Sequence, residues 1–352
     1  KGREDWGQLL HSLASLYVQG GTIDWSSFHR DFPAGKVALP TYPFQHQQRY
    51  WMEVMPESSH SSSHQVFDWL HPLVGRKVDS PLLRETLFET PFSTTTLPLL
   101  DDHRIFGHLV VSGASHISLI LGAVELHSGV GPCALEDVLF PEALVVPEER
   151  ERSVQLVLRA EEDTGVPFEL ISYGPTGKKD WTTHATGRVI SDPPASQLST
   201  TERQQIEARC SEEMTAVELY EQIQKQRYIE LGPRYQWIES IKRGGDEAFC
   251  RMEQPAVVVA EAGRYQLHPG LIDSCFGLLV TLVETDSEET FVPFSLEQVR
   301  FYKRPTGKRL WAHAVLRQDR RNVGDIQLFE ESGEKIAEFV GLHELEVQAI
   351  AD

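Results

Sequence analysis

A histidine precedes a Ser-Gly turn in the first half of the sequence. His103 is followed by Gly107 and then by Ser112-Gly113, which opens a run of apolar residues at helical spacing. A neutral imidazole can remove a proton, and unpaired amides at a helix N-terminus can hold an oxygen that gains negative charge. This order of parts indicates a general base beside an oxyanion site, whereas a histidine taken alone is more often a turn residue.

A carboxylate stands in an otherwise apolar helical segment of the second half. Pro269 suits the first position of that helix, and Asp273 lies one turn later on the same face. Burying a charged carboxylate is costly unless it is paired or protonated. Asp273 is therefore either a structural hydrogen-bond acceptor or an acid with a raised pKa that donates a proton, and this helix alone does not distinguish the two.

Two halves of similar length carry these residues, and each is expected to hold one buried helix among antiparallel strands. Apolar residues at helical spacing predict the helices at 115–126 and 269–283. β-Branched and alternating apolar runs predict the strands, which are 109–111, 154–158, 168–173, 248–252, 257–260, 310–316, 326–329, 335–339 and one near Val299. The pattern predicts an α+β fold made of two sheets, each wrapped around a helix.

Composition divides the chain into five segments. Residues 1–55 begin with leucines at helical spacing, which end at Gly20-Gly21, and continue into the proline-rich aromatic run 39–51. A segment of this size cannot bury its own aromatic residues, so we expect it to be the trailing end of an upstream domain. Two polar segments, 56–70 and 191–212, are expected to be linkers, and they separate halves at 71–190 and 213–352.

The charge balance excludes several classes of partner. The 352 residues include 33 Lys and Arg against 52 Asp and Glu, a formal net charge of −19, so nucleic acid is not an expected partner. No apolar run is long enough to span a membrane, and the charged start is unlike a secretory signal. The four cysteines lack metal-ligand spacing, which predicts free thiols, no metal site and a cytoplasmic location.

Seven sequence blocks, in the right order, resemble parts of modular polyketide synthases. Residues 1–51, through the run 39–51, are similar to the linker after an acyltransferase domain, and residues 71–352 resemble a dehydratase domain. The catalytic motif HxxxGxxxxP is matched from His103 to Ser112 and a second one by the run from His268 to Asp273. The other blocks are His71–Gly75, Trp181–Gly187, Leu231–Tyr235 and Val292–Ser295.

The resemblance implies a double hotdog fold with the active site between its halves. It assigns His103 as the base, the Gly113 amide as the donor to the thioester carbonyl, and protonated Asp273 as the acid that releases a 3-hydroxyl group as water. The implied substrate is a 3-hydroxyacyl thioester on the phosphopantetheine arm of an acyl carrier protein, and the product is a 2,3-enoyl thioester. The resemblance also implies no cofactor, neighbouring domains of the same megasynthase, and a homodimer.

Nine further residues are expected to line the pocket, and four of them depart from the family's pattern. The set is Gly107, Ser112, Tyr228, Leu231, Pro233, Tyr235, Gly277, Pro293 and Leu296. Ser112 replaces a proline but offers a hydroxyl that can cap the next helix, and Leu231 replaces the tyrosine of YGP. Gly277 stands where glutamine or histidine usually orients the acid, and Leu296 stands where tryptophan often follows Pro-Phe-Ser. Each change removes a polar or shaping group.

These departures leave three functions open. If the four departures are only drift within the family, the domain is a simple dehydratase. A weakly oriented Asp273 in a more apolar pocket instead favours a second step, which shifts the double bond from 2,3 to 3,4 or closes an oxygen ring. The third hypothesis is an inactive dimeric spacer, against which the retention of His103 and Asp273 argues.

The acyl carrier protein also needs a docking surface. Carrier proteins of this kind are usually acidic, so a chain with a net charge of −19 needs a local basic patch to receive one. The densest basic cluster in the sequence is Arg300, Lys303, Arg304, Lys308 and Arg309. We expect the carrier to dock there.

Overall fold

The computed structural model describes residues 5–31, 69–129, 131–148, 150–160, 164–173, 181–190, 199–283, 290–320 and 322–347. The chain forms two compact units, residues 1–63 and 64–352. The aromatic run 39–51, most of the segment 56–70 and the first part of the segment 191–212 lie outside the described residues. None of the described helices is long and apolar enough to cross a membrane.

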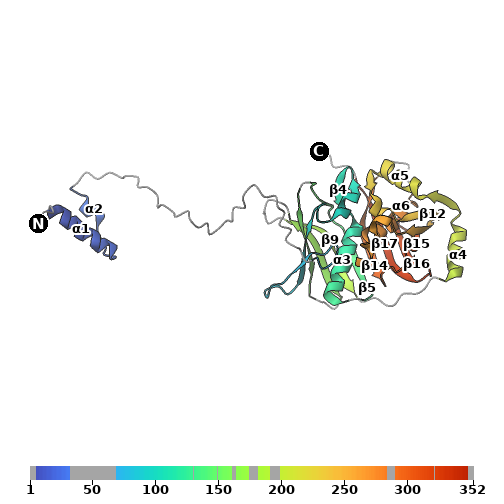
Figure 1. Cartoon of the computed structure of the whole chain (residues 1–352), viewed down its shortest axis with the longest axis horizontal. Helices are drawn as coiled ribbons and strands as arrows, with labels where there is room; N and C mark the ends of the chain where they lie inside the picture. Colours follow the sequence, from blue (N-terminus) through green and yellow to red (C-terminus); the bar gives the residue numbers. More distant parts are fainter. Residues whose placement is uncertain are drawn as a thin grey trace. The chain divides into compact units, whose positions relative to one another are not determined.

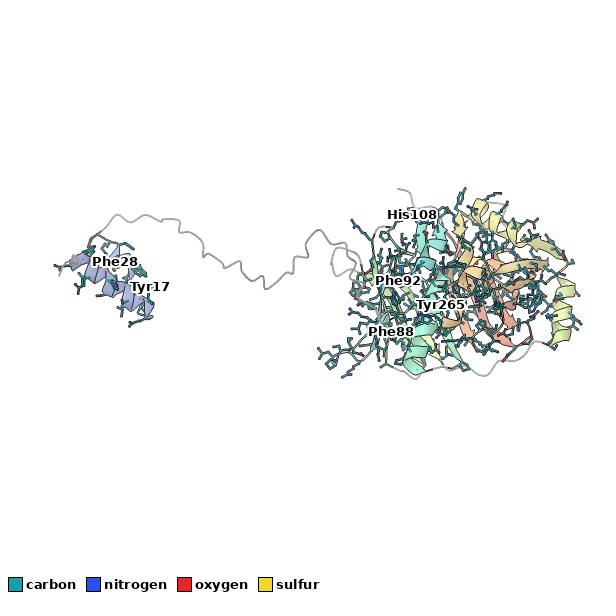
Figure 2. The ribbon with its side chains drawn as sticks, viewed as in Figure 1. Tyr17, Phe28, Phe88, Phe92, His108 and Tyr265 are labelled. Atoms are coloured by element: carbon teal, nitrogen blue, oxygen red, sulfur yellow. The ribbon has the colours of Figure 1, made fainter. Side chains whose placement is uncertain are left out.

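The first unit, within residues 5–31, contains helices α1 (Asp5–Val18) and α2 (Trp25–Phe28). Trp25 packs edge-on against Tyr17 and Phe28, with ring centroids 5.2 and 5.9 Å apart (Figure 2). No residue of either helix is buried. The expectation that residues 1–55 cannot bury their aromatic residues rests on the run 39–51, which lies outside the described residues.

The described residues of the second unit form a 13-stranded antiparallel sheet to which both halves contribute (Figure 1). In spatial order, the first half supplies β1 (Arg76–Val78), β2 (Thr86–Phe92), β7 (Arg152–Leu158), β8 (Val166–Tyr173), β9 (Trp181–Ile190) and β5 (Cys133–Leu139). The second half continues with β14 (Thr290–Phe301), β17 (Lys335–Val347), β16 (Val323–Glu330), β15 (Arg309–Leu316), β13 (Glu247–Glu253), β12 (Ile238–Gly244) and β10 (Glu212–Thr215). Strand β5 pairs with β14, so the sheets of the two halves join edge to edge.

A four-stranded sheet also combines both halves. Its order is β11 (Ile229–Leu231), β3 (His103–Ile105), β4 (His108–Val111) and β6 (Leu144–Val145). Strand β11 of the second half pairs with β3 of the first, which places Leu231 opposite His103. The β3–β4 hairpin turns at Phe106 and Gly107, both of which have positive φ, a conformation that suits glycine.

One buried helix lies in each half, α3 (Gly113–Ser128) and α6 (Pro269–Val280), and the two pack against each other. Ser112 caps α3 by accepting a hydrogen bond from the Ser115 amide at 3.1 Å, which confirms the capping role expected for its hydroxyl. His268 caps α6, because its Nδ1 accepts a hydrogen bond from the Gly270 amide at 3.1 Å. All residues from 114 to 124 are buried, so α3 is a core helix.

The hydrophobic core of the second unit includes buried aromatic rings. Phe88 and Phe92 of β2 and Tyr265 are each at most 2% exposed, and Figure 2 shows them in the second unit. The ring of Tyr265 contacts that of His268 edge-on, with centroids 4.8 Å apart. This packing holds the capping histidine at the start of α6. The four cysteines, all within the described residues, are buried and form no disulfide bond, which agrees with the thiols predicted from the sequence.

The structure confirms both predicted helices and every predicted strand but one. The expected strand 257–260 is absent, because its first two residues belong to a 3-10 turn, η3 (Ala256–Val258), in which the Val258 amide donates to the Pro255 carbonyl at 3.1 Å. Within the described residues of the second unit, two helices were not expected from the sequence, α4 (Thr200–Arg209) and α5 (Ala216–Arg227), and α4 occupies part of the expected linker 191–212. Each begins with a capping box, a sequence pattern that predicts the start of a helix. The remaining 3-10 turns are η1 (Pro98–Asp102), η2 (Pro233–Tyr235) and η4 (Ala262–Arg264).

Polar contacts around Asp102 fix β3 to the second half. Its carboxylate accepts hydrogen bonds from the amide and from the guanidinium of Arg234, both at 3.1 Å. Its carbonyl accepts a bond from the Gly232 amide at 2.7 Å. Because Asp102 directly precedes His103, these contacts set the position of the histidine relative to the second half.

The two buried helices are also tied to the opposite halves. The Ser118 hydroxyl of α3 donates a hydrogen bond to the Leu267 carbonyl at 2.7 Å, just before α6 begins. The hydroxyls of Ser115 and Tyr235 lie 3.0 Å apart. Side chains at both ends of this interface are buried, so the bonds are shielded from water.

We expect Gly232→Ala to weaken this junction. Gly232 has φ −75°, which alanine tolerates, but a Cβ there would lie 2.4 Å from Asp102 Oδ1 and 2.8 Å from its Cβ. Displacing Asp102 should lower the free energy of unfolding by about 1–3 kcal/mol. Gly263→Ala is the matched control, because no atom lies within 4 Å of a Cβ there. Equal urea denaturation midpoints for the two variants would contradict this account.

Candidate active site

His103 and Asp273 line one cavity of about 150 Å³. His103 comes from β3 of the first half, and Asp273 comes from α6 of the second. Gly113, at the first position of α3, also lines the cavity. The structure therefore brings together, from distant segments, the base, the acid and the helix N-terminus expected from the sequence.

The hydrogen bonding of His103 determines which of its ring nitrogens can accept a proton. Its side chain is buried, and Nδ1 lies 2.7 Å from the Val110 carbonyl across the hairpin. A carbonyl only accepts hydrogen bonds, so Nδ1 must carry the proton and donate it. In the neutral ring, Nε2 is then the unprotonated nitrogen and can act as the base. The ring also packs against Tyr235, with centroids 5.4 Å apart.

Asp273 is held in a state that favours its proton. Burial raises the pKa of its carboxyl above the ordinary value, and the nearby His103 imidazole opposes this shift. No hydrogen bond from the described residues contributes to the shift in the Asp273 pKa. Of the two alternatives that the sequence left open, the structure favours the protonated acid over the structural acceptor.

Gly277 leaves open space beside Asp273. It lies one turn later on α6 and lines the cavity. The nearest atom to a Cβ at this position would be Ile223 Cδ1, at 3.9 Å. A larger side chain would fit there, so the glycine is not required by packing.

The N-terminus of α3 forms another part of the wall. Ser112 and Gly113 line the cavity together with Pro293 of β14. A Cβ at Gly113 would lie 3.4 Å from the Phe140 ring and 3.5 Å from Pro293 Cβ, so these two side chains flank the glycine. Leu231, opposite His103 in the strand pair, completes the group of expected residues that line the cavity.

The other five expected lining residues, all within the described part of the chain, are placed elsewhere. Gly107 forms the β3–β4 turn, and Tyr228 is 42% exposed and stacks on Phe106. Leu296 is buried in the hydrophobic core. The leucine at this position therefore does not form part of the cavity wall.

Pro233 and Tyr235 do not line the cavity, but Tyr235 contacts His103, which does. Both belong to the turn η2, and Tyr235 packs on the far side of His103 while bonding to Ser115. Burial raises the pKa of the Tyr235 phenol well above its ordinary value, so the hydroxyl stays protonated. Tyr235 supports the base without lining the cavity.

Four titratable residues of the cavity wall were not expected from the sequence, His116, Glu142, Arg227 and Glu344, and of these Glu142 is exposed. Burial lowers the pKa of His116 to about 3, so its ring is neutral, and both of its nitrogens lack a hydrogen-bond partner among the described residues. Glu344 is 2% exposed, and burial raises its pKa to about 8. In the sequence, Glu344 stands two positions after Leu342, so on a strand the two side chains point to the same, inward face. This spacing was the only indication that Glu344 is buried.

Comparisons with known proteins identify the family. Residues 71–173 match the profile described as polyketide synthase dehydratase domain, and residues 199–349 match one described as polyketide synthase dehydratase N-terminal domain. The fold is similar to that of the dehydratase domain from the CurJ module of curacin polyketide synthase, with a TM-score of 0.73 and 37% identity over 79% of this chain and 97% of that one.

Curated relatives are much longer proteins. The chain is 26% identical to polyketide synthase PksM of Bacillus subtilis (strain 168) over 92% of its own length, and 31% identical to polyketide synthase GfsB of Streptomyces halstedii over 75%. It spans only 8% and 5% of those two proteins.

The chain belongs to the dehydratase domains of polyketide synthases. Its fold is the double hotdog of that family, and membership implies a carbon–oxygen lyase activity. Among the described residues, no cluster of three or more His, Cys, Asp or Glu side chains is arranged to hold a metal ion.

The raised pKa of Glu344 predicts a pH-dependent stability. Its pKa is about 8 when folded and near 4.5 ordinarily, so the unfolded chain loses this proton first as pH rises. The stability that this group contributes is present below about pH 4.5 and is lost as pH rises towards 8. Relative to Glu344→Gln, the free energy of unfolding of wild type should fall by up to about 5 kcal/mol over that range.

Urea denaturation of wild type and Glu344→Gln at a series of pH values measures this difference. Glu346→Gln, an exposed position on the same strand, serves as the control and should show no such trend. A constant difference between wild type and Glu344→Gln at every pH would mean that Glu344 ionises normally.

Proposed function

We propose that this cavity dehydrates a 3-hydroxyacyl thioester carried on an acyl carrier protein, giving a 2,3-enoyl thioester and water. The single observation that carries the proposal is the meeting of two groups in one cavity, His103 with an unprotonated Nε2 and Asp273 with a raised pKa. An elimination that removes a proton and hydroxide from neighbouring carbons needs one base and one acid of this kind.

The base acts first at carbon 2. His103 Nε2 accepts the proton from carbon 2, and the electron pair left behind moves toward the thioester carbonyl. The Gly113 amide, at the first position of α3, donates to the oxygen that gains negative charge. The Val110 carbonyl accepts from Nδ1 and so stabilises the imidazolium that forms.

The acid completes the elimination at carbon 3. Hydroxide is a poor leaving group, so Asp273 transfers its proton to the 3-hydroxyl as the carbon–oxygen bond breaks. The products are water, the 2,3-enoyl thioester, a carboxylate at Asp273 and an imidazolium at His103. Transfer of one proton from His103 to Asp273, through water, restores both groups. The raised pKa of Asp273 favours this return.

Replacing either group should stop the reaction. With a synthetic 3-hydroxyacyl pantetheine thioester, His103→Phe and Asp273→Asn should each reduce kcat/KM by about 10²–10⁴-fold, because each removes one proton-transfer partner. Thermal unfolding of both proteins checks that they remain folded. If wild type dehydrates the thioester no faster than His103→Phe and Asp273→Asn do, the domain is the inactive spacer.

The partners follow from the proposed substrate. An acyl carrier protein would present the thioester, and a homodimer is the arrangement that the family resemblance suggests. The expected basic docking cluster is partly neutralised, because Arg300, Lys303 and Arg304 form ion pairs with acidic side chains of this chain. Lys308 and Arg309 are exposed and are the stronger candidates for contact with an acidic carrier.

A second candidate is a dehydratase that continues past the enoyl product. The observation that favours it is the open space at Gly277 together with the lack of a hydrogen bond to Asp273 from the described residues. A carboxyl that is free to reorient can reach a second carbon, which would shift the double bond to 3,4. A hydroxyl further along the acyl chain can alternatively add to the enoyl product and close an oxygen ring.

Proton NMR of the product separates these reactions, because the enoyl, shifted and cyclised products have equal mass. We expect Gly277→Gln, which supplies an amide one turn from Asp273, to raise the share of 2,3-enoyl product if wild type makes a mixture. The physical reason is that a hydrogen bond from the amide would restrict the carboxyl to one orientation. A wild-type product that is entirely the 2,3-enoyl thioester would leave simple dehydration as the function.

A further inference from the structure

We infer that Glu344, with Arg227 near it, forms a second polar site in the cavity that binds a hydroxyl group on the acyl chain beyond carbon 3. The inference rests on the proposed function, since it assumes an acyl thioester in the cavity. It adds a substrate feature, because the proposed elimination uses neither residue.

Strand register directs Glu344 into the cavity. On β17 it pairs with Pro293 on β14. Residues directly opposite each other on antiparallel strands point to the same face, so the two side chains share a direction. Pro293 faces Gly113 at the cavity wall, with its Cβ 3.5 Å from the position of a Gly113 Cβ. Both Glu344 and Pro293 line the cavity.

The hydrogen bonding of Glu344 is incomplete. Its Oε2 is buried and has no hydrogen-bond partner among the described residues. Other buried carboxylates of this half are well satisfied. Glu330 accepts bonds from the Thr306 amide and hydroxyl at 2.6 and 2.8 Å, and Glu338 accepts one from the Tyr302 hydroxyl at 2.7 Å. An unpartnered buried carboxyl is unfavourable for folding, so a group supplied by a ligand is the natural partner for Glu344.

The cavity that Glu344 lines extends along α6 past Asp273, since Val280 and Arg227 also belong to its wall. Arg227 and Asp273 both act electrostatically on its carboxyl, in opposite directions. The Arg227 guanidinium lies over the Phe291 ring, 5.1 Å from its centroid, and donates to the Val280 carbonyl at 3.5 Å. Val280 ends α6, about 10 Å along the helix axis from Asp273. Glu344 therefore interacts with Asp273 and also with Arg227, which contacts the end of α6. The end of α6 lies past Asp273, the residue assigned to the 3-hydroxyl.

The chemistry of the site favours a hydroxyl over a charged group. An ammonium group would be repelled by Arg227, and a carboxylate would add a further buried carboxyl beside those of Glu344 and Asp273. The neighbouring wall, which includes Phe276, Val280 and Phe291, is apolar and suits an alkyl chain. A hydroxyl can donate to the carboxylate form of Glu344 and accept from its protonated form.

Binding of unreactive ligands tests this inference without turnover. The probes are saturated acyl pantetheine thioesters of one length that lack a 3-hydroxyl, either unsubstituted or with a hydroxyl on carbon 5 or carbon 7. Isothermal titration calorimetry with the 352-residue chain measures each Kd. For wild type, one hydroxylated ligand should bind at least about tenfold tighter than the unsubstituted one.

Substitutions assign any preference to Glu344. Glu344→Leu should abolish the preference, and Glu344→Gln, which keeps hydrogen-bonding groups, should retain most of it. Glu346→Leu removes the same charge at an exposed position of the same strand and should bind all three ligands as wild type does.

Two results would overturn the inference. One is equal affinity of wild type for all three ligands, which needs no substitution. The other is a preference that survives Glu344→Leu. Dehydration of a 3-hydroxyacyl thioester is assayed separately, so loss of that reaction with an intact hydroxyl preference would contradict only the proposed function.

Discussion

The site depends on one strand pairing between the halves. Strand β11 binds β3 so that Leu231 lies opposite His103, and Asp102 is bonded to Arg234 beside that pair. The base and the acid belong to different halves, and they face one cavity only while the halves keep this register. A shift of one residue would turn the His103 side chain to the opposite face of its strand. The polar bonds around Asp102 oppose such a shift because they fix backbone and side chain together.

Burial then gives these two residues their separate chemical states. The Val110 carbonyl fixes the proton of His103 on Nδ1, while the apolar wall raises the pKa of the Asp273 carboxyl. A base without a proton and an acid with one can therefore coexist in the same cavity. Burial also raises the pKa of the Glu344 carboxyl, which therefore favours its protonated form more than an exposed carboxyl would.

The four departures from the family's motifs have different structural consequences. Ser112 caps α3 with its hydroxyl, so the helix keeps a defined start without proline. Leu296 belongs to the core and leaves the cavity unchanged. Leu231 and Gly277 do line the cavity, and both make it less polar near His103 and Asp273. Of the four departures, these two are therefore the ones placed to affect the chemistry in the cavity.

The sequence by itself determined the two buried helices, nearly all of the strands expected from it, and His103, Gly113 and Asp273 as candidates, because periodicity, capping residues and motifs are local signals. It also indicated the family, whose motifs survive in order along the chain. It did not identify Glu344 or Arg227, and it placed Tyr235 and Leu296 in a wall that they do not line. Only the tertiary structure decided those positions, because the face to which a side chain points depends on strand register, and its pKa depends on neighbours that are distant in the chain.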